Sequence, residues 1–385
     1  MIDIFTNMKY IEPLTYFQQL KDNGPHNNQE VWEFTNEIKP IDLYCYLNVK
    51  FGPPNGLLTF LRNDTSNNLI HWDWALISDL GNINIEGHNF RTEVHVTKDL
   101  IEKGITVDDF INQIKSDFKN YGREMSEFKK QLEKWTEFIN PFARLQETIR
   151  ILFGKLEELN IDPENDKIAS PFKYSEDIEE VKRVWNDRSE KYMFATGLIY
   201  GLRSMLPVMA ESFINLLIFT LCQPEIKKNE RLFNSFLRNP IDIRIQSLHL
   251  HCEGFTECVD YDSPECKDFH TLINERNDLL HGNININKLA FGEVYFNKRT
   301  PIFTSYKDFW EKSIGISLDS VKYEKIYDDM LIVENFIGYV LSKLKKDKRN
   351  TIEALMINIR LGYDAKRGKT GILFPKHLAE IRGKK

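Results

Sequence analysis

The sequence predicts an α+β protein, with a mostly antiparallel, β-rich N-terminal domain followed by helices and a C-terminal helical bundle. Short runs of strand-forming residues, separated by turn residues, occupy roughly the first hundred positions. Near Val107 the apolar residues change to the three- and four-residue steps of amphipathic helices. This change gives predicted segments of 1–106 for the β-rich domain and 107–165 for connecting helices and a linker.

The N-terminal sheet is predicted from runs of β-branched and aromatic residues. The expected strands are 43–51, 57–61, 69–77 and 90–96. Between the first two, Gly52-Pro-Pro-Asn-Gly56 is a dense turn signal. These runs indicate a small, mostly antiparallel sheet.

The rest of the chain has a helical period. Two helical stretches are expected at 107–138 and 142–159, and the polar segment 160–167 is expected to be a linker and domain boundary. A helical bundle is predicted over 166–350, followed by a basic C-terminal tail at 351–385. The expected bundle helices are 176–199, 205–222, 228–238, 264–281 and 316–346, with a strand-like insertion at 289–296.

Composition and net charge restrict the kinds of function that this chain can have. The chain has 385 residues, 42% hydrophobic and 28% charged, which is typical of a globular protein of two or three domains. The net charge of −6 argues against a broad nucleic-acid-binding coat but leaves room for a local basic groove. Five cysteines without a recognisable secretory leader predict reduced thiols and a cytoplasmic protein.

Segment 205–222 is apolar and about long enough to span a membrane. Polar Glu211, Ser212 and Asn215 lie in its middle, so a buried bundle helix is expected instead, and no membrane partner. The sequence contains no Walker loop, no dinucleotide-binding glycine pattern and no His-Glu-x-x-His. No cofactor is therefore expected.

The segment Arg276-Asn-Asp-Leu-Leu-His281-Gly282 has the residue types that RNA cleavage without a metal requires. His281 can transfer the proton of a 2′-hydroxyl, and Arg276 can hold the phosphate while charge builds on it. Asn277 can orient the reacting groups. Asn277 and His281 are four residues apart, on one face of a helix, whereas Arg276 lies about 140° around it from His281. Gly282 stands where a C-cap would end the helix, with Leu279 and Leu280 expected to anchor it in the core.

This segment resembles the Arg-polar-x-x-x-His motif of HEPN domains, helical bundles found in ribonucleases of toxin–antitoxin, abortive-infection and CRISPR-associated systems. The resemblance covers roughly residues 176–346 and implies a HEPN-like bundle that forms a homodimer, with two motifs meeting in one cleft. It also implies an endoribonuclease with Arg276, Asn277 and His281 in the roles above. The layout is similar to that of Apea-like phage-defence proteins, which implies antiviral defence and a trigger, or an antitoxin, of unknown kind.

Two alternatives to a ribonuclease site stay open. A HEPN-like module can bind RNA or a partner without cutting, or the motif can be only a structural helix end. The spacing alone is weak, because Arg244 and His249 have the same spacing without a following glycine. Lys227, Lys228, Arg231 and Arg244 are candidates for an RNA path, with a solvated helix face as the alternative.

Three other groups of residues are weaker candidates for sites. Cys252, Cys258, Cys266 and His270 are soft ligands near one another in sequence, but their spacing matches no common zinc pattern, so free thiols are expected. Arg91 and His95 occupy alternate strand positions, and nothing else in the sequence supports a site there. The aromatic run at 71–74 is expected to be packing rather than a base-stacking surface.

Overall fold

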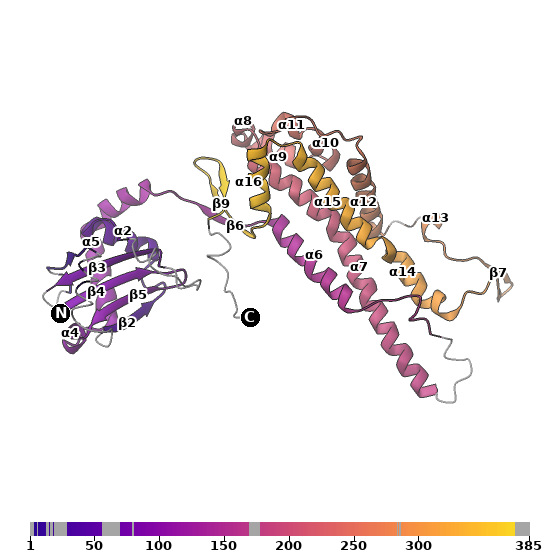
Figure 1. Ribbon diagram of the computed structural model, residues 1–385, viewed down its shortest axis with the longest axis horizontal. Coiled ribbons are helices and arrows are strands. Elements are labelled where there is room, and N and C mark those ends of the chain that lie inside the picture. Colours follow the sequence, from indigo (N-terminus) through magenta and orange to yellow (C-terminus); the bar gives the residue numbers. More distant parts are fainter. Residues whose placement is uncertain are drawn as a thin grey trace. The chain divides into compact units, whose positions relative to one another are not determined.

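The computed structural model describes residues 4–5, 7–12, 15, 18, 29–55, 70–78, 81–168, 178–282, 284 and 286–373. It is an α+β structure with two compact units (Figure 1), unit 1 (residues 1–134 and 374–385) and unit 2 (residues 135–373). The division falls at 134/135, before the polar segment 160–167 where the sequence predicts it. The polar segment belongs to unit 2, because Lys191 donates to the Asn160 carbonyl and Tyr192 to the Asp166 carboxylate.

Unit 1 contains the antiparallel sheet that the sequence predicts. Its five strands have the order β1-β3-β4-β5-β2, and all their pairings are antiparallel. The strands are β1 (Lys9–Tyr10), β2 (Gln29–Phe34), β3 (Trp72–Ser78), β4 (Gly81–Gly87) and β5 (Thr92–Thr97). Strands β3 and β5 confirm the predictions at 69–77 and 90–96, whereas 57–61 lies outside the described residues. Strands β1, β2 and β4 were not predicted.

The helices of unit 1 cover one face of this sheet (Figure 1): α2 (Pro40–Phe51), α4 (Lys98–Glu102) and α5 (Val107–Gln131). The prediction of a strand at 43–51 is wrong. Leu43, Tyr46 and Leu47 are spaced for one helix face and are fully buried, and Pro40 opens the helix. Packing against the sheet and α5 thus outweighs the strand preference of the aromatic residues.

Unit 2 is the predicted helical bundle with small sheets attached. Its helices are α6 (Pro141–Glu158), α7 (Ile178–Leu221), α8 (Pro224–Lys228), α9 (Glu230–Arg238), α10 (Ile241–Gln246), α11 (Leu248–His251), α12 (Pro264–His281), α13 (Ile286–Leu289), α14 (Ile316–Val321), α15 (Ile326–Ser342) and α16 (Lys346–Met356), with a π-helical turn at Glu311–Gly315 and a 3-10 turn at Tyr323–Lys325. The predicted helices 176–199 and 205–222 are one helix, α7. The predicted helix 316–346 is divided into α14, the 3-10 turn and α15.

Helix α7 is the centre of the bundle and packs against α6, α12 and α15. It is long and apolar enough to cross a membrane, but 56% of its most apolar window is buried inside unit 2. This burial is compatible with the core helix that the sequence predicts for 205–222.

The strands of unit 2 correct three predictions. Helix α5 ends at Gln131, and the expected helix up to 138 is replaced by β6 (Thr136–Ile139). The expected tail at 351–385 begins with α16 and then forms β9 (Arg360–Asp364) and β10 (Lys369–Gly371), which join β6 in a three-stranded sheet. The insertion at 289–296 contains only the start of a hairpin, β7 (Val294–Asn297) and β8 (Thr300–Phe303).

Candidate active site at the end of helix α12

Helix α12 has the bounds that the sequence predicts and carries Arg276, Asn277 and His281 in its last two turns. Its N-terminus is capped by Ser263, whose side chain accepts a backbone hydrogen bond from the first turn. Gly282 follows His281 and adopts the left-handed conformation, with φ 61°. The predicted glycine C-cap is confirmed, and it ends the helix directly after His281.

Arg276 is paired inside its own chain. Its Nη2 donates to Oε1 of Glu211 on α7, at a distance of 2.8 Å. The Arg276 side chain is 18% exposed, and its Nε is buried without a hydrogen-bond partner. The guanidinium group is thus held in place and keeps an unused donor.

The carboxylate of Glu211 is shared by a second arginine. Oε2 of Glu211 lies 3.4 Å from Nη2 of Arg244, whose Nη1 donates to Oδ1 of Asn215 at 2.6 Å. These contacts explain why polar Glu211 and Asn215 stand in the apolar part of α7. Two guanidinium groups facing one carboxylate leave a local excess of positive charge beside Arg276. Arg244 itself is buried, so the prediction that it contacts RNA is wrong.

His281 is exposed at the last position of α12, and Asn277 is half-buried one turn earlier. Among the described residues, no hydrogen bond or ion pair joins Arg276 to His281, because Arg276 is directed to α7. The structure therefore brings Arg276 to Glu211 and leaves His281 apart. Leu280 is 43% exposed, so it does not anchor the helix end as expected, whereas Leu279 is half-buried.

A buried ion-pair network that the sequence did not reveal lies beside the motif. Arg203 on α7 donates to Asp329 on α15 at 2.6 Å and to Glu275 on α12 at 2.5 Å. Lys322 approaches the other oxygen of Glu275 at 2.8 Å. Burial raises the pKa of Glu275, but Lys322 and Arg203 outweigh it and lower the pKa below its usual value. The network fixes the orientation of α12 relative to two neighbouring helices.

The predicted RNA-binding lysines and arginines divide into two groups. Lys227 is held inside unit 2, where its ammonium group donates to the Phe219 carbonyl at 2.5 Å and lies over the Tyr363 ring. It offers no free charge to RNA, which corrects the prediction. Lys228 and Arg231 are exposed and line an open hollow of about 680 Å³ that also contains two glutamates. Only these two remain candidates for an RNA contact.

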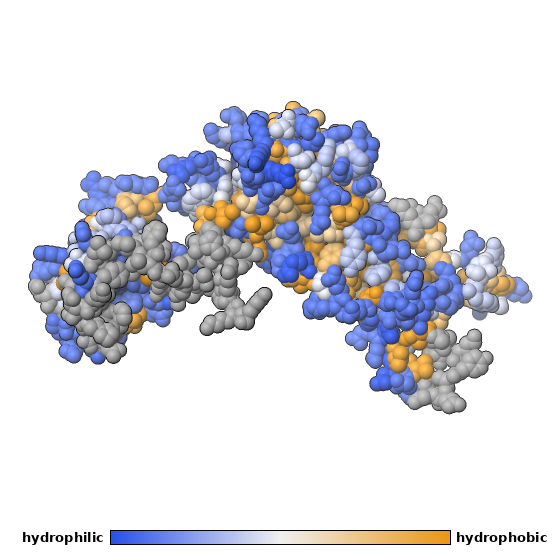
Figure 2. Space-filling model, in the orientation of Figure 1, coloured by the Kyte–Doolittle hydropathy of each residue, from blue (hydrophilic) through white to orange (hydrophobic). Residues whose placement is uncertain are grey.

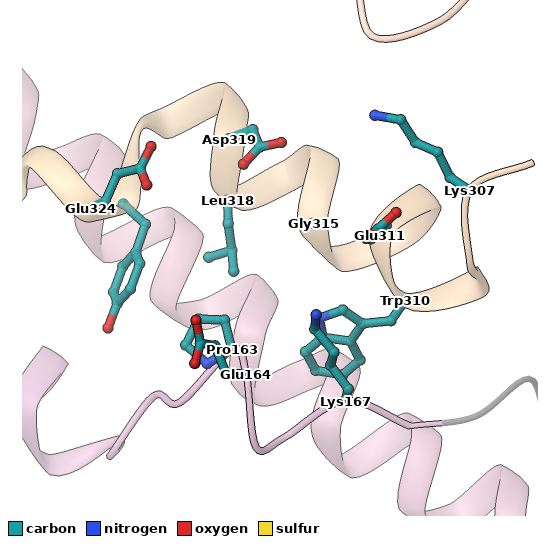
Figure 3. Close-up of a pocket in the computed structure, with 11 residues that line it drawn as sticks. Pro163, Glu164, Lys167, Lys307, Trp310, Glu311, Gly315, Leu318, Asp319 and Glu324 are labelled. Carbon is teal, nitrogen blue, oxygen red and sulfur yellow. The ribbon is translucent and has the colours of Figure 1, made fainter. Parts of the chain in front are cut away.

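A pocket of about 430 Å³ lies beside α14 (Figure 3). Leu318 and Trp310 point from the helical side towards the loop that carries Pro163 (Figure 3). Its charged lining residues are four carboxylates and two lysines, namely Glu164, Lys167, Lys307, Glu311, Asp319 and Glu324. This excess of negative charge disfavours a phosphate chain.

The suggested zinc ligands of unit 2 do not converge. Cys252, Cys258, Cys266 and His270 do not bring three ligand atoms within reach of one ion. Cys266 is fully buried, and burial raises the pKa of its thiol. His270 Nδ1 is instead 3.0 Å from the hydroxyl of Tyr261. The cysteines are free thiols, as the sequence predicts.

Comparison with known proteins adds no relative. No family model, no curated protein and no solved structure matches the chain. The resemblance to HEPN domains rests on the segment from Arg276 to Gly282 and on the bundle around it, and it stays a prediction.

Proposed function

We propose that unit 2 is a metal-independent endoribonuclease of HEPN type that acts as a homodimer in the cytoplasm, in phage defence or a toxin system. In this setting unit 1 would respond to the trigger. The observation that carries the proposal is the end of α12, where a glycine cap places an exposed His281 one turn after Asn277. Beside it, Arg276 belongs to a cluster with more guanidinium groups than carboxylates.

The proposed reaction forms one bond to phosphorus and breaks one. The 2′-oxygen of the RNA attacks the adjacent phosphorus after it loses its proton to His281, and the bond to the 5′-oxygen breaks. The leaving oxygen takes a proton, which gives a 2′,3′-cyclic phosphate and a 5′-hydroxyl end. Arg276 stabilises the charge that develops on the phosphate oxygens, and Asn277 orients the reacting groups.

The geometry of one chain favours a composite site. Arg276 turns towards α7 and His281 towards solvent, so one copy does not direct both side chains at one phosphate. A two-fold dimer brings a second Arg276 and a second His281 to the same place. Apolar residues on the surface of unit 2 support an association of this kind (Figure 2). Ile284, two residues after Gly282, is 83% exposed, and Phe291 is 59% exposed.

The rival function is a HEPN-like module that dimerises or binds RNA or a partner without cutting. The Arg276–Glu211 ion pair favours this rival, because a carboxylate on the guanidinium competes with a phosphate. The two functions differ in a single measurement, which is cleavage of bound RNA.

The test is cleavage of end-labelled RNA in EDTA by the wild type and by His281→Ala. His249→Ala is the matched control, because His249 is also exposed and follows an arginine by five residues. We expect His281→Ala to lose cleavage by about 100-fold or more, with the control unchanged. Equal cleavage by wild type and His281→Ala would overturn the proposal. Binding without cleavage by the wild type would establish the rival.

A mixing experiment tests the composite site. Arg276→Ala and His281→Ala are each expected to be inactive, but a mixed dimer contains one site with both wild-type residues. After subunit exchange, activity should return to about a quarter of the wild-type value, since half of the dimers are mixed and each has one intact site. If both residues act within one chain, mixing restores nothing.

A further inference from the structure

One face of the β4–β5 hairpin in unit 1 carries two glutamates and two histidines whose side chains converge. The register places Glu86 directly opposite Glu93, and His95 opposite Asn84. His88 follows Glu86 by two residues, where the chain turns towards β5. Each strand thus contributes a glutamate and a histidine two residues later, on the face opposite the hydrophobic core.

The ligand atoms of Glu86, His88 and Glu93 all lie within 4.8 Å of one another, close enough to share one metal ion. Nε2 of His88 lies 3.4 Å from Oε2 of Glu86 and 3.4 Å from Oε2 of Glu93. Nε2 of His95 lies 3.6 Å and 3.5 Å from the same two oxygens but does not belong to this group. The distances from His88 exceed those of good N–H···O hydrogen bonds. They agree with the ligand separations around a tetrahedral zinc ion, about 3.3–3.5 Å for ligand bonds of about 2.0–2.15 Å.

The histidine nitrogens are buried without hydrogen bonds. The His88 side chain is 0% exposed, and neither of its ring nitrogens has a hydrogen-bond partner. Nε2 of His95 is also buried and unpartnered. A buried polar atom without a partner is unfavourable, and a bound cation would give Nε2 of His88 a partner.

Each glutamate has one oxygen held by a neighbour and the other free to face the histidines. Oε1 of Glu86 accepts a hydrogen bond from Nδ2 of Asn84 at 2.7 Å. Oε1 of Glu93 accepts one from Nε of Arg91 at 2.6 Å. Carboxylates that bind metals are commonly oriented in this way by a second layer of donors.

The negative charge on this face also favours the binding of a cation. Asp73, Glu86, Glu93 and Glu33 are direct neighbours across β3, β4, β5 and β2, and like charges in such positions repel. Arg91 pairs with Glu33 and Glu93.

We propose that Glu86, His88 and Glu93 bind a divalent transition-metal ion, and that this ion is zinc. An imidazole nitrogen and two carboxylate oxygens are ligands that Zn²⁺ takes. The ion would tie β4 to β5. The sequence signal is a pair of Glu-x-His patterns, Glu86 with His88 and Glu93 with His95. The sequence prediction named only His95 of these four residues, together with Arg91.

The test measures zinc in the full-length protein after removal of metal with a chelator, reconstitution with Zn²⁺ and gel filtration. We expect about one zinc per chain in the wild type. Glu93→Gln and His88→Ala should each lower the zinc affinity more than about 100-fold, beyond the effect of changing an outer-layer residue. His270→Ala is the matched control and should keep its zinc.

Folding of each variant is monitored by circular dichroism. If His88→Ala does not fold, Glu93→Gln alone tests the site, because it changes only one oxygen to nitrogen near the rim of the site. Cobalt provides a second readout, because Co²⁺ in a tetrahedral site absorbs strongly in the visible, and this absorption should be lost in Glu93→Gln. Zinc content that is equal in wild type and Glu93→Gln overturns the proposal. So does loss of zinc in His270→Ala alone, which would place the ion at the cysteines. His281→Ala should bind zinc like the wild type, so this test is independent of the ribonuclease proposal.

Discussion

Nη2 of Arg276 lies 2.8 Å from Oε1 of Glu211, and this ion pair connects the motif helix α12 to the core helix α7. The same carboxylate is 3.4 Å from Arg244. Glu211 therefore holds Arg276 in one orientation without neutralising the whole cluster. An arginine that is pre-positioned in this way needs less ordering when a phosphate binds.

The first prediction concerns Glu211. Glu211→Gln keeps the shape of the side chain but removes its charge, so two half-buried or buried guanidinium groups lose their common counter-ion. We expect the free energy of unfolding to fall by about 1–3 kcal/mol, measured by urea denaturation. Glu230→Gln, on the exposed surface of α9, should change it by less than about 0.5 kcal/mol. Equal effects of both variants would show that the ion pair contributes nothing to stability.

The second prediction concerns the helix end. Gly282→Ala forces a side chain into a left-handed conformation and should lower the free energy of unfolding by about 1 kcal/mol. Gly154→Ala is the matched control within α6, where no atom lies within 4 Å of an added Cβ. It should raise stability by about 0.5–1 kcal/mol, because alanine favours a helix interior. A stabilising Gly282→Ala would contradict the cap. If His281 is catalytic, the same variant should also reduce RNA cleavage.

The third prediction concerns the buried network of α7, α12 and α15. Arg203→Met removes the arginine partner of Asp329 and one of the two cations that contact Glu275, and should lower the free energy of unfolding by about 3–5 kcal/mol. The double variant with Asp329→Leu should recover part of this loss, since it removes one uncompensated buried carboxylate. Chemical denaturation of the two single variants and the double variant gives the coupling energy. Additive losses would mean that the two residues do not act as a pair.

The fourth prediction is a pH dependence in unit 1. Burial raises the pKa of Asp117, but hydrogen bonds from Lys50 and Tyr46 outweigh it and lower the pKa below the ordinary 3.8. The carboxylate therefore stabilises the folded state above about pH 3.8, and the contribution is lost as the pH falls through the lowered value. Asp117→Asn should cost about 1 kcal/mol at pH 7 and less below pH 3.8. The control Glu124→Gln changes an exposed residue of the same helix. Its difference in stability from the wild type should not shrink as the pH falls.

The fold was predictable where local signals and packing agree. Helix α12 carries a serine N-cap, a proline at its first position and a glycine C-cap, and its bounds were predicted correctly. The prediction of a strand at 43–51 is wrong because the residue types favour a strand, whereas the spacing of the apolar residues buries one face of a helix. Strand β6 was not predicted for a different reason. Its partner β9 is more than 200 residues later, and no local pattern indicates such a pairing.

The candidate site was predictable only in part. Residue types singled out Arg276 and His281, but the sequence had no means of showing that Glu211, in a distant helix, binds Arg276. Lys227 and Arg244 were misjudged because a basic residue in sequence gives no sign of its internal partners. The ligand group on β4 and β5 was missed because β4 itself was not predicted, so the cross-strand neighbours of Glu93 and His95 were unknown.

The return of the C-terminal strand to β6 has a consequence for synthesis on the ribosome. Asn140, at the start of α6, donates to the carbonyls of Leu355 and Asn358, and β6 pairs with β9. Unit 2 can therefore close only after β9 has been translated, whereas the sheet of unit 1 has emerged long before. If unit 2 cuts RNA, a nascent chain is harmless to the messenger that encodes it until β9 has left the ribosome.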